Sequence, residues 1–187
     1  MFSGIKQIGI VVALSIALGG CLIVHTVNQE QLYSTQYVSW AAYKGSYPVE
    51  INGNPLGSST LADEKLLSAM QMPHWIAPRN FHLMPHADRG TGHRLVLVFN
   101  PASPYTSGES ICASAYTRTS APGTRMKIIG ALCSGKDNVS RATAEGDVQP
   151  GLRDQNFVGL LNSLLAGTMP ARNKNHDSTD CRIPPCS

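Results

Sequence analysis

Methionine and histidine side chains that could bind a metal ion gather in one stretch of the sequence. They form two short groups, each with a proline directly before its last histidine: Met70, Met72 and His74, and then His82, Met84 and His86. Thioether and imidazole groups are the ligands that soft copper prefers, and imidazole also binds zinc. This composition indicates a copper or zinc site as an alternative function for residues 70–93.

The same residues also fit a structural role. Their spacing is loose and prolines interrupt the segment, so no local geometry brings the ligands together. Met70 falls on the apolar face of a predicted helix, whereas Met72 and Met84 have flexible side chains that suit gaps in a core. The histidines would then lie in loops or at the start of a strand. We therefore expect no cofactor, with copper or zinc as the alternative.

Motifs for covalent catalysis do not stand out in the sequence. Neither residues 107–110 nor residues 133–136 have the G-x-S-x-G form of a nucleophile elbow. The glycine-rich residues 88–92 follow no strong strand and open no helix, so they make a poor phosphate cradle. A C-x-x-C redox motif is absent from the sequence. The sequence therefore favours a protein that is not an enzyme.

The first 21 residues have the organisation of a bacterial export signal. Lys6 precedes an uncharged apolar run over residues 8–18, and a Leu-Gly-Gly-Cys sequence occupies 18–21. This sequence resembles the lipobox of bacterial lipoproteins. The resemblance implies cleavage before Cys21, attachment of palmitate or similar acyl chains to that cysteine and, with Leu22 next to it, sorting to the outer membrane.

An uncleaved signal anchor in the inner membrane is the alternative for this segment. Apolar residues continue from Ile8 to Val24, a span of 17 residues that is near the short limit for a membrane-spanning helix. Gly19 and Gly20 would lie inside such a helix, where glycine is unfavourable. They suit the extended backbone that a peptidase needs. We therefore expect a lipid anchor, with the folded part facing the periplasm.

Charge is low and spread evenly along the chain. There are 15 Lys and Arg residues and 12 Asp and Glu residues, which give a formal charge of +3. Such a chain lacks the concentrated positive charge of nucleic-acid-binding proteins. We therefore exclude nucleic acid as a partner. The residues after Cys21 are numerous enough to form one compact domain with a real core.

The four cysteines beyond Cys21 predict two disulfides, because an even number is typical of exported domains. Residues 110–118 and 125–134 read as two strands around a Pro-Gly turn at 122–123. Their antiparallel pairing would place Cys112 opposite Cys133, within bridging distance. Cys181 and Cys186 would then close a short loop near the C-terminus.

The remaining elements follow from local patterns. β-branched and aromatic residues predict strands at 33–40, 47–52, near 80–84 and at 93–99, and the last of these is apolar enough to be covered on both faces. Thr60 and Asp63 resemble a capping box at the start of a helix that ends at Pro73. Apolar residues at helical spacing predict a second helix from about Asp154 to Ala166. Residues 136–151 read as loop, with a short edge strand around 141–144.

These elements predict an α+β fold: a mainly antiparallel sheet of about five strands, two packed helices and a disulfide-tied hairpin. The expected organisation has four parts. They are a signal peptide over 1–20, a lipidated tether over 21–32, a single domain over 33–170 and a mobile tail over 171–187 that carries the small disulfide loop.

Beyond the lipobox, three features resemble those of uncharacterised small proteobacterial envelope proteins. They are residues 53–57 (Gly-Asn-Pro-Leu-Gly), residues 94–101 and the spacing of Cys112 to Cys133. This resemblance implies no activity. We expect a non-enzymatic outer-membrane lipoprotein that faces the periplasm and binds an envelope protein partner in assembly or transport. A periplasmic copper- or zinc-binding lipoprotein is the alternative.

Overall fold

The computed structural model describes residues 23–29, 33–42, 45–77, 80–103, 106–114, 116–121, 123 and 125–173. Strands and helices alternate irregularly along the chain, so the predicted α+β class is confirmed. The order is β1 (Ile23–Gln29), α1 (Thr35–Ala41), β2 (Tyr47–Asn52), α2 (Thr60–Ala69), β3 (Phe81–Leu83), the 3-10 turn η1 (His86–Asp88), β4 (His93–Phe99), α3 (Gly108–Ala113), β5 (Met126–Ser134), β6 (Asp137–Gly146) and α4 (Gln155–Thr168).

The six strands form one mixed sheet in the order β1-β6-β5-β4-β2-β3. The pairs β1–β6, β6–β5 and β5–β4 are antiparallel, whereas β2 pairs in parallel with both β3 and β4. The expectation of a mainly antiparallel sheet therefore holds for one half of the sheet only. The parallel half arises because α2 returns the chain from β2 to β3, and a parallel neighbour needs such a crossover connection.

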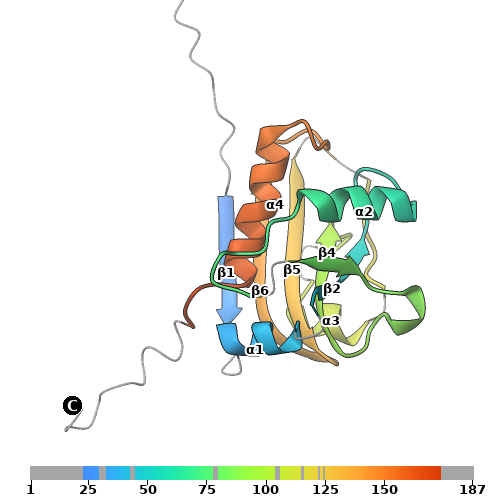
Figure 1. Cartoon of the computed structure of the whole chain (residues 1–187). Helices are drawn as coiled ribbons and strands as arrows, with labels where there is room; N and C mark the ends of the chain where they lie inside the picture. Colours follow the sequence, from blue (N-terminus) through green and yellow to red (C-terminus); the bar gives the residue numbers. More distant parts are fainter. Residues whose placement is uncertain are drawn as a thin grey trace, which may run out of the picture.

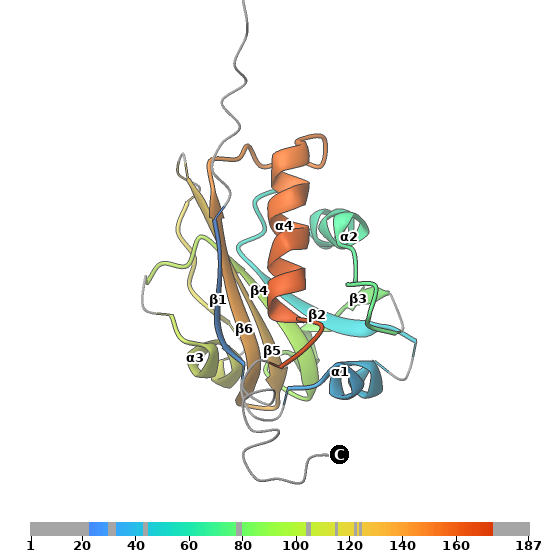
Figure 2. The same ribbon diagram turned by 90° about the vertical axis from the view of Figure 1, so that its left-hand side faces the viewer.

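In the part of the chain that the structure describes, three α-helices cover one face of the sheet and one covers the other. α1, α2 and α4 lie on one face and α3 on the opposite face (Figures 1 and 2). A large apolar core fills the space under α4, and a smaller one, which contains Val96, Val98 and Ile129, lies under α3. β4 contributes to both cores and every residue from Arg94 to Phe99 is buried, which confirms that this strand is covered on both faces.

The segment predicted as a strand over 33–40 is a helix instead. Ser34 caps α1, because its hydroxyl accepts a hydrogen bond of 3.0 Å from the backbone N–H of Tyr37. Val38 and Ala42 are one helical turn apart and both are fully buried. Aromatic and β-branched composition favoured a strand here, but the cap and the four-residue spacing of the buried side chains support a helix.

The predicted hairpin of residues 110–118 and 125–134 is also wrong. β5 has β4 on one edge and β6 on the other, so no edge remains for residues 110–118. Ser107 accepts a hydrogen bond of 3.1 Å from the N–H of Ser110 and begins α3. The chain over 108–113 therefore packs on the face of the sheet as a helix.

β6 corrects the expectation for residues 136–151. The segment predicted as loop with a short edge strand is a ten-residue strand with a neighbour on each side. β1 is one of these neighbours, with Ile23 opposite Glu145 and Gln29 opposite Ser140. The sheet therefore begins inside the segment that we expected to be a tether over 21–32.

The two predicted helices are present with small differences at their ends. α4 runs from Gln155 to Thr168 with Asp154 as its cap, close to the expected range. Ser59, rather than Thr60, caps α2, and this helix ends at Ala69 before Pro73. α1 and α3 are additional to the two that we expected. Across the residues that the structure describes, no helix is both long enough and apolar enough to span a membrane.

Candidate functional site

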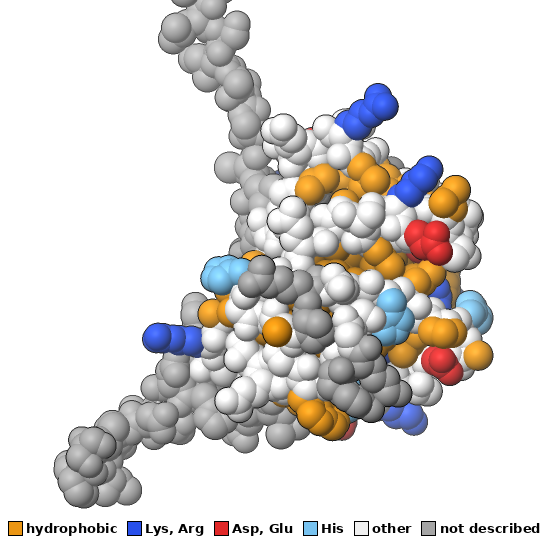
Figure 3. Space-filling model, in the orientation of Figure 1, with side chains coloured by type: hydrophobic (Ala, Val, Ile, Leu, Met, Phe, Trp, Pro, Cys, Tyr) orange, Lys and Arg blue, Asp and Glu red, His pale blue; other side chains and the backbone are white. Residues whose placement is uncertain are grey.

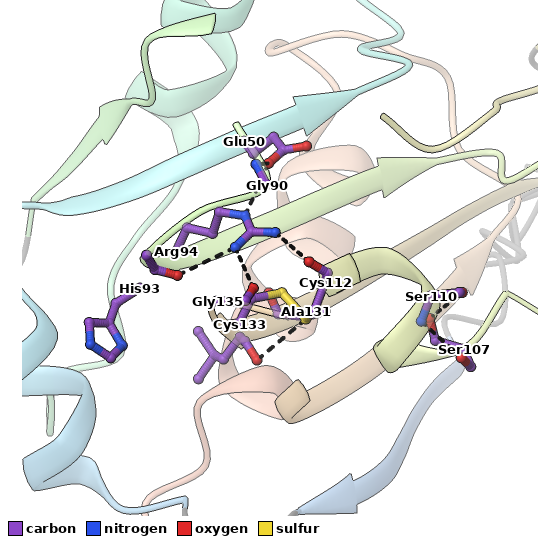
Figure 4. The surroundings of a disulfide bond; sticks show 12 residues. Glu50, Gly90, His93, Arg94, Ser107, Ser110, Cys112, Ala131, Cys133 and Gly135 are labelled. Carbon is purple, nitrogen blue, oxygen red and sulfur yellow. Dashed lines mark hydrogen bonds and ion pairs between the residues drawn. A yellow bond between two sulfur atoms is a disulfide. The ribbon is translucent and has the colours of Figure 1, made fainter. Parts of the chain in front are cut away.

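His93 and Arg94, the first two residues of β4, belong to two different groups of side chains on opposite faces of the sheet. Successive side chains of a strand point to opposite faces, and Figure 4 shows Arg94 turned toward the disulfide while His93 points away from it. Arg94 belongs to a buried polar network under α3. His93 belongs to a partly exposed group of rings beside α1.

The buried network centres on an ion pair between Arg94 and Glu50. The Nε atom of Arg94 lies 3.1 Å from Oε2 of Glu50, and neither side chain has any exposed surface. The same carboxylate oxygen accepts a hydrogen bond of 3.2 Å from the N–H of Gly90, and Oε1 lies 3.4 Å from the amide nitrogen of Asn52. Buried charges are tolerated only when they are paired and hydrogen-bonded in this way.

The other nitrogens of Arg94 connect the strand to distant parts of the chain. Nη2 donates to the carbonyl oxygen of Cys112 at 2.8 Å, and Nη1 donates to that of Gly135 at 2.8 Å. Nη1 also lies 3.3 Å from the carbonyl oxygens of Thr91 and Gly92. One guanidinium therefore joins β4, β2, α3 and the β5–β6 turn. We assign this network a structural role that positions the surrounding loops.

A disulfide between Cys112 and Cys133 lies beside this network, as predicted. The Cα atoms are 5.4 Å apart and both residues are fully buried. The predicted register is wrong, because Arg94 rather than Cys112 lies opposite Cys133 in the sheet. The bridge therefore fastens α3 to the sheet. Cys21, Cys181 and Cys186 lie outside the described residues.

On the other face, Tyr37, Trp40 and His93 form a cluster that we call the aromatic surface. The hydroxyl of Tyr37 lies 2.6 Å from Nδ1 of His93. The rings of Tyr37 and Trp40 approach the His93 ring edge-to-face, with centroids 5.4 and 5.0 Å away. Trp40 is 59% exposed. A large, mostly exposed indole thus packs against the His93 ring at the surface, and such a group can anchor a protein partner.

Burial raises the pKa of the Tyr37 hydroxyl above its usual value, and a hydrogen bond with Ser134 opposes this effect in part. Tyr37 therefore remains a neutral phenol at physiological pH and can hydrogen-bond to the imidazole. The aromatic surface offers apolar contact area and hydrogen-bonding groups.

Sequence reasoning missed the aromatic surface. The segment 33–40 was expected to be a strand, which would place Tyr37 and Trp40 on opposite faces. In the helix, residues three apart lie on the same side. Ser34, a residue type that commonly caps helices, was the available signal for the start of this helix.

The six predicted metal ligands are spread over several environments. Met70 and Met72 pack in the main core and Met84 is also buried. The exposed ring of His74 stands edge-to-face on Trp75, with centroids 4.7 Å apart. His86 is exposed in η1, and Nδ1 of the exposed His82 lies 2.7 Å from the hydroxyl of Ser46.

Two of these six residues, Met70 and His82, line one hollow of about 630 Å³ between α2 and β3. Glu64, on the facing side of α2, lines it as well. Hydrophobic side chains gather on this face of the molecule (Figure 3). Within the described part of the chain, no three His, Cys, Asp or Glu side chains are grouped closely enough to hold a metal ion.

The aromatic surface is therefore the best candidate for a binding site, and the hollow beside β3 is the second. All residues of both sites belong to this one chain. When the chain is compared with protein-family models, with curated proteins and with solved structures, no significant match is found.

Proposed function

We propose that this protein is a lipid-anchored envelope protein that faces the periplasm and binds a protein partner through the aromatic surface. The outer membrane is its proposed location, and envelope assembly or transport is its proposed process. The observation that carries this proposal is the exposed indole of Trp40, which packs against the ring of His93. Its helix, α1, lies at the end of the body opposite the start of β1 (Figure 1).

The disulfide supports the proposed compartment. Disulfides persist in oxidising environments such as the periplasm and are rare in the cytosol. Both sulfur-bearing residues are buried and fasten α3 to β5, so the bridge is part of the folded core. An export signal over residues 1–20, cleaved before Cys21, would deliver the chain to such an environment.

The chemistry of the aromatic surface supports a protein as the ligand. Trp and Tyr dominate the energetically important positions of protein interfaces, because they bury a large area with little loss of side-chain freedom. Hydrogen bonding to Tyr37 already restricts the ring of His93. A partner would therefore bind a preorganised surface, which lowers the entropic cost of association.

Partner capture in intact cells tests this proposal. The full-length protein and its Trp40→Ala variant are crosslinked in the native envelope and purified, and the attached proteins are identified. We expect a specific partner with the wild type and a loss of at least tenfold with Trp40→Ala. The matched control is Tyr116→Ala, since Tyr116 is 63% exposed and lies outside the aromatic surface. Equal capture by all three proteins would contradict the assignment.

The lipid anchor is tested separately. Radiolabelled palmitate should enter the wild-type protein and not the Cys21→Ala variant. Mass analysis of the mature N-terminus should find an acylated cysteine at position 21. An unmodified N-terminus, or an uncleaved segment 1–20, would rule out the lipoprotein assignment.

A copper or zinc site in the hollow beside β3 is the second candidate function. It is favoured by one observation, namely that Met70 and His82 line the same hollow together with Glu64. The mature protein, the His82→Ala variant and the control His74→Ala are purified, and their bound metal is measured. This second candidate predicts copper or zinc in the wild type and the control but not in His82→Ala. Equal metal content in all three proteins would exclude this site.

A further inference from the structure

The connection between the proposed anchor and the folded body is very short. β1 begins at Ile23, which is paired with Glu145 of β6, and only Leu22 separates this residue from Cys21. Because a fully extended chain spans at most about 3.6 Å per residue, two residues of chain give the connection a maximum length of roughly 7 Å. An acyl chain on Cys21 would therefore hold the end of the sheet close to the bilayer surface.

The loop between β6 and α4, residues 147–154, lies at the same end of the body. Figure 1 shows this loop at the top, on the side where β1 begins, and α1 at the opposite end. Hydrogen bonds within the loop define its shape: Asp154 donates its N–H to the carbonyl oxygen of Gly151 at 3.1 Å, and its carboxylate accepts from the N–H of Gln149 at 3.0 Å. These hydrogen bonds keep the loop compact at this end of the body.

Leu152 and Arg153 are exposed at the surface of this loop. Leu152 is 38% exposed and Arg153 is exposed beside it. An apolar side chain next to a cation suits the boundary between acyl chains and phosphate headgroups.

We propose that the loop 147–154 rests on the bilayer, with Leu152 at the level of the upper acyl chains and Arg153 at the phosphate headgroups. This inference depends on the proposed acylation of Cys21 and fixes the orientation that the anchor imposes. The aromatic surface would then point away from the membrane, toward the periplasm.

The charged residues near this loop indicate that the lipid anchor, rather than attraction of positive charge to anionic lipid, brings the loop to the bilayer. Glu145 lies 3.4 Å from both Arg125 and Lys127 and forms ion pairs with them. The exposed Asp147 also belongs to the loop. Because positive and negative groups are mixed here, electrostatic attraction to anionic lipid is weak. The short connection through Leu22 therefore determines which end of the body meets the bilayer.

Quenching of tryptophan fluorescence by brominated lipids tests this orientation. Full-length protein processed and acylated in its native host is reconstituted into phosphatidylethanolamine–phosphatidylglycerol vesicles whose acyl chains carry bromine near the headgroup. Leu152→Trp is compared with Ala171→Trp, which adds a tryptophan just past the other end of α4. This helix has 14 residues and spans about 21 Å. The native residues Trp40 and Trp75 provide the background signal.

We expect bromine to quench at least half of the emission that Leu152→Trp adds, and less than a tenth of the emission that Ala171→Trp adds. Mass analysis of the same samples reports acylation of Cys21. If Cys21 is acylated and Leu152→Trp is not quenched, the orientation is wrong while the anchor stands. If Cys21 is not acylated, both proposals fail.

A longer connection provides the second arm of the test. Ten Gly and Ser residues are inserted between Leu22 and Ile23, which adds a flexible segment with an average span of roughly 18 Å. We expect the quenching of Leu152→Trp to fall at least threefold, because the body can then move away from the bilayer. Quenching that persists unchanged would overturn the short connection as its cause.

Discussion

At the level of single residues, Arg94 connects several parts of the chain through its side chain. Its guanidinium is fully buried against Glu50 and donates to carbonyl groups from three other parts of the chain. A buried ion pair is weak grounds for high stability, because desolvation offsets much of the attraction. Removal of one partner is different, since it leaves the other charge buried without compensation.

We predict that Glu50→Gln lowers the free energy of unfolding by about 3–5 kcal/mol. The substitution keeps the size of the side chain and removes the charge that balances Arg94. Urea denaturation followed by circular dichroism measures the change. Glu64→Gln is the matched control, because Glu64 is exposed on α2, and we expect a change within about 0.5 kcal/mol. A loss below 1 kcal/mol in Glu50→Gln would show that the pair does not organise this region.

At the level of elements, the approach of α4 to the sheet depends on a glycine in β5. A Cβ atom at Gly130 would lie 2.6 Å from Oγ1 of Thr168 and 3.3 Å from Cγ of Leu164. Both residues belong to the buried side of α4. The helix therefore packs this closely only because residue 130 has no side chain.

Gly130→Ala should destabilise the protein by about 1–3 kcal/mol, because overpacking forces the helix away from the sheet. Gly159→Ala is the control within α4, since nothing lies within 4 Å of the added Cβ atom. That substitution should leave stability unchanged or raise it by up to about 1 kcal/mol. Thermal unfolding of the two variants gives the comparison. Equal unfolding temperatures would contradict the close packing of α4 on β5.

The start of α4 predicts a dependence of stability on pH. Hydrogen bonds from the backbone N–H groups of Asn156 and Gln149 lower the pKa of the Asp154 carboxyl. Because the folded state favours the charged carboxylate, its contribution is present above the pKa of an unfolded aspartate. It is lost as the pH falls through the lower folded pKa.

Asp154→Ala should therefore lower the urea midpoint at neutral pH, and the difference from the wild type should shrink as the solution is acidified. Midpoints measured from neutral pH down to about pH 2, below the ordinary aspartate pKa, give this comparison. Asp154→Asn keeps an oxygen that can cap the helix and does not titrate. Its difference from Asp154→Ala should stay constant with pH. A constant difference between the wild type and Asp154→Ala would show that the charge contributes nothing.

At the level of the whole molecule, the disulfide makes the stability of the fold depend on the redox state of its surroundings. Cys112 and Cys133 are separated by 21 residues, and closing a loop of this length restricts the unfolded chain. The entropic model assigns this restriction about 3 kcal/mol. The fold is therefore expected to be most stable where thiols are oxidised.

Protein made without residues 1–20 in a reducing cytosol should contain free thiols at 112 and 133. Its free energy of unfolding should be about 3 kcal/mol below that of the oxidised protein, and mild oxidation should restore the difference. A Cys112→Ala/Cys133→Ala variant is the control, since its stability should not respond to reductant. Thiol titration together with urea denaturation checks both statements. Identical stability of the reduced and oxidised forms would remove the physical link between this fold and an oxidising compartment.

Several elements could be predicted from the sequence because their patterns are local. The apolar run of β4 is long enough to indicate burial on both faces, and the spacing of apolar residues in α4 repeats with the helical period. The pairing of Cys112 with Cys133 was also predicted correctly, although through the wrong register. Both segments do lie close together, as a helix on a strand rather than as two strands.

The tertiary structure decided the neighbours of each strand and the composition of the candidate site. β6 occupies the free edge of β5, so the segment around Cys112 became a helix, and β1 extended the sheet into the residues expected to form a tether. Tyr37 and His93 are 56 residues apart in the chain and meet only because α1 packs beside the start of β4. Strand order depends on which edges remain unpaired, and this competition involves the whole chain. Local periodicity therefore determined individual elements, whereas their packing determined the aromatic surface.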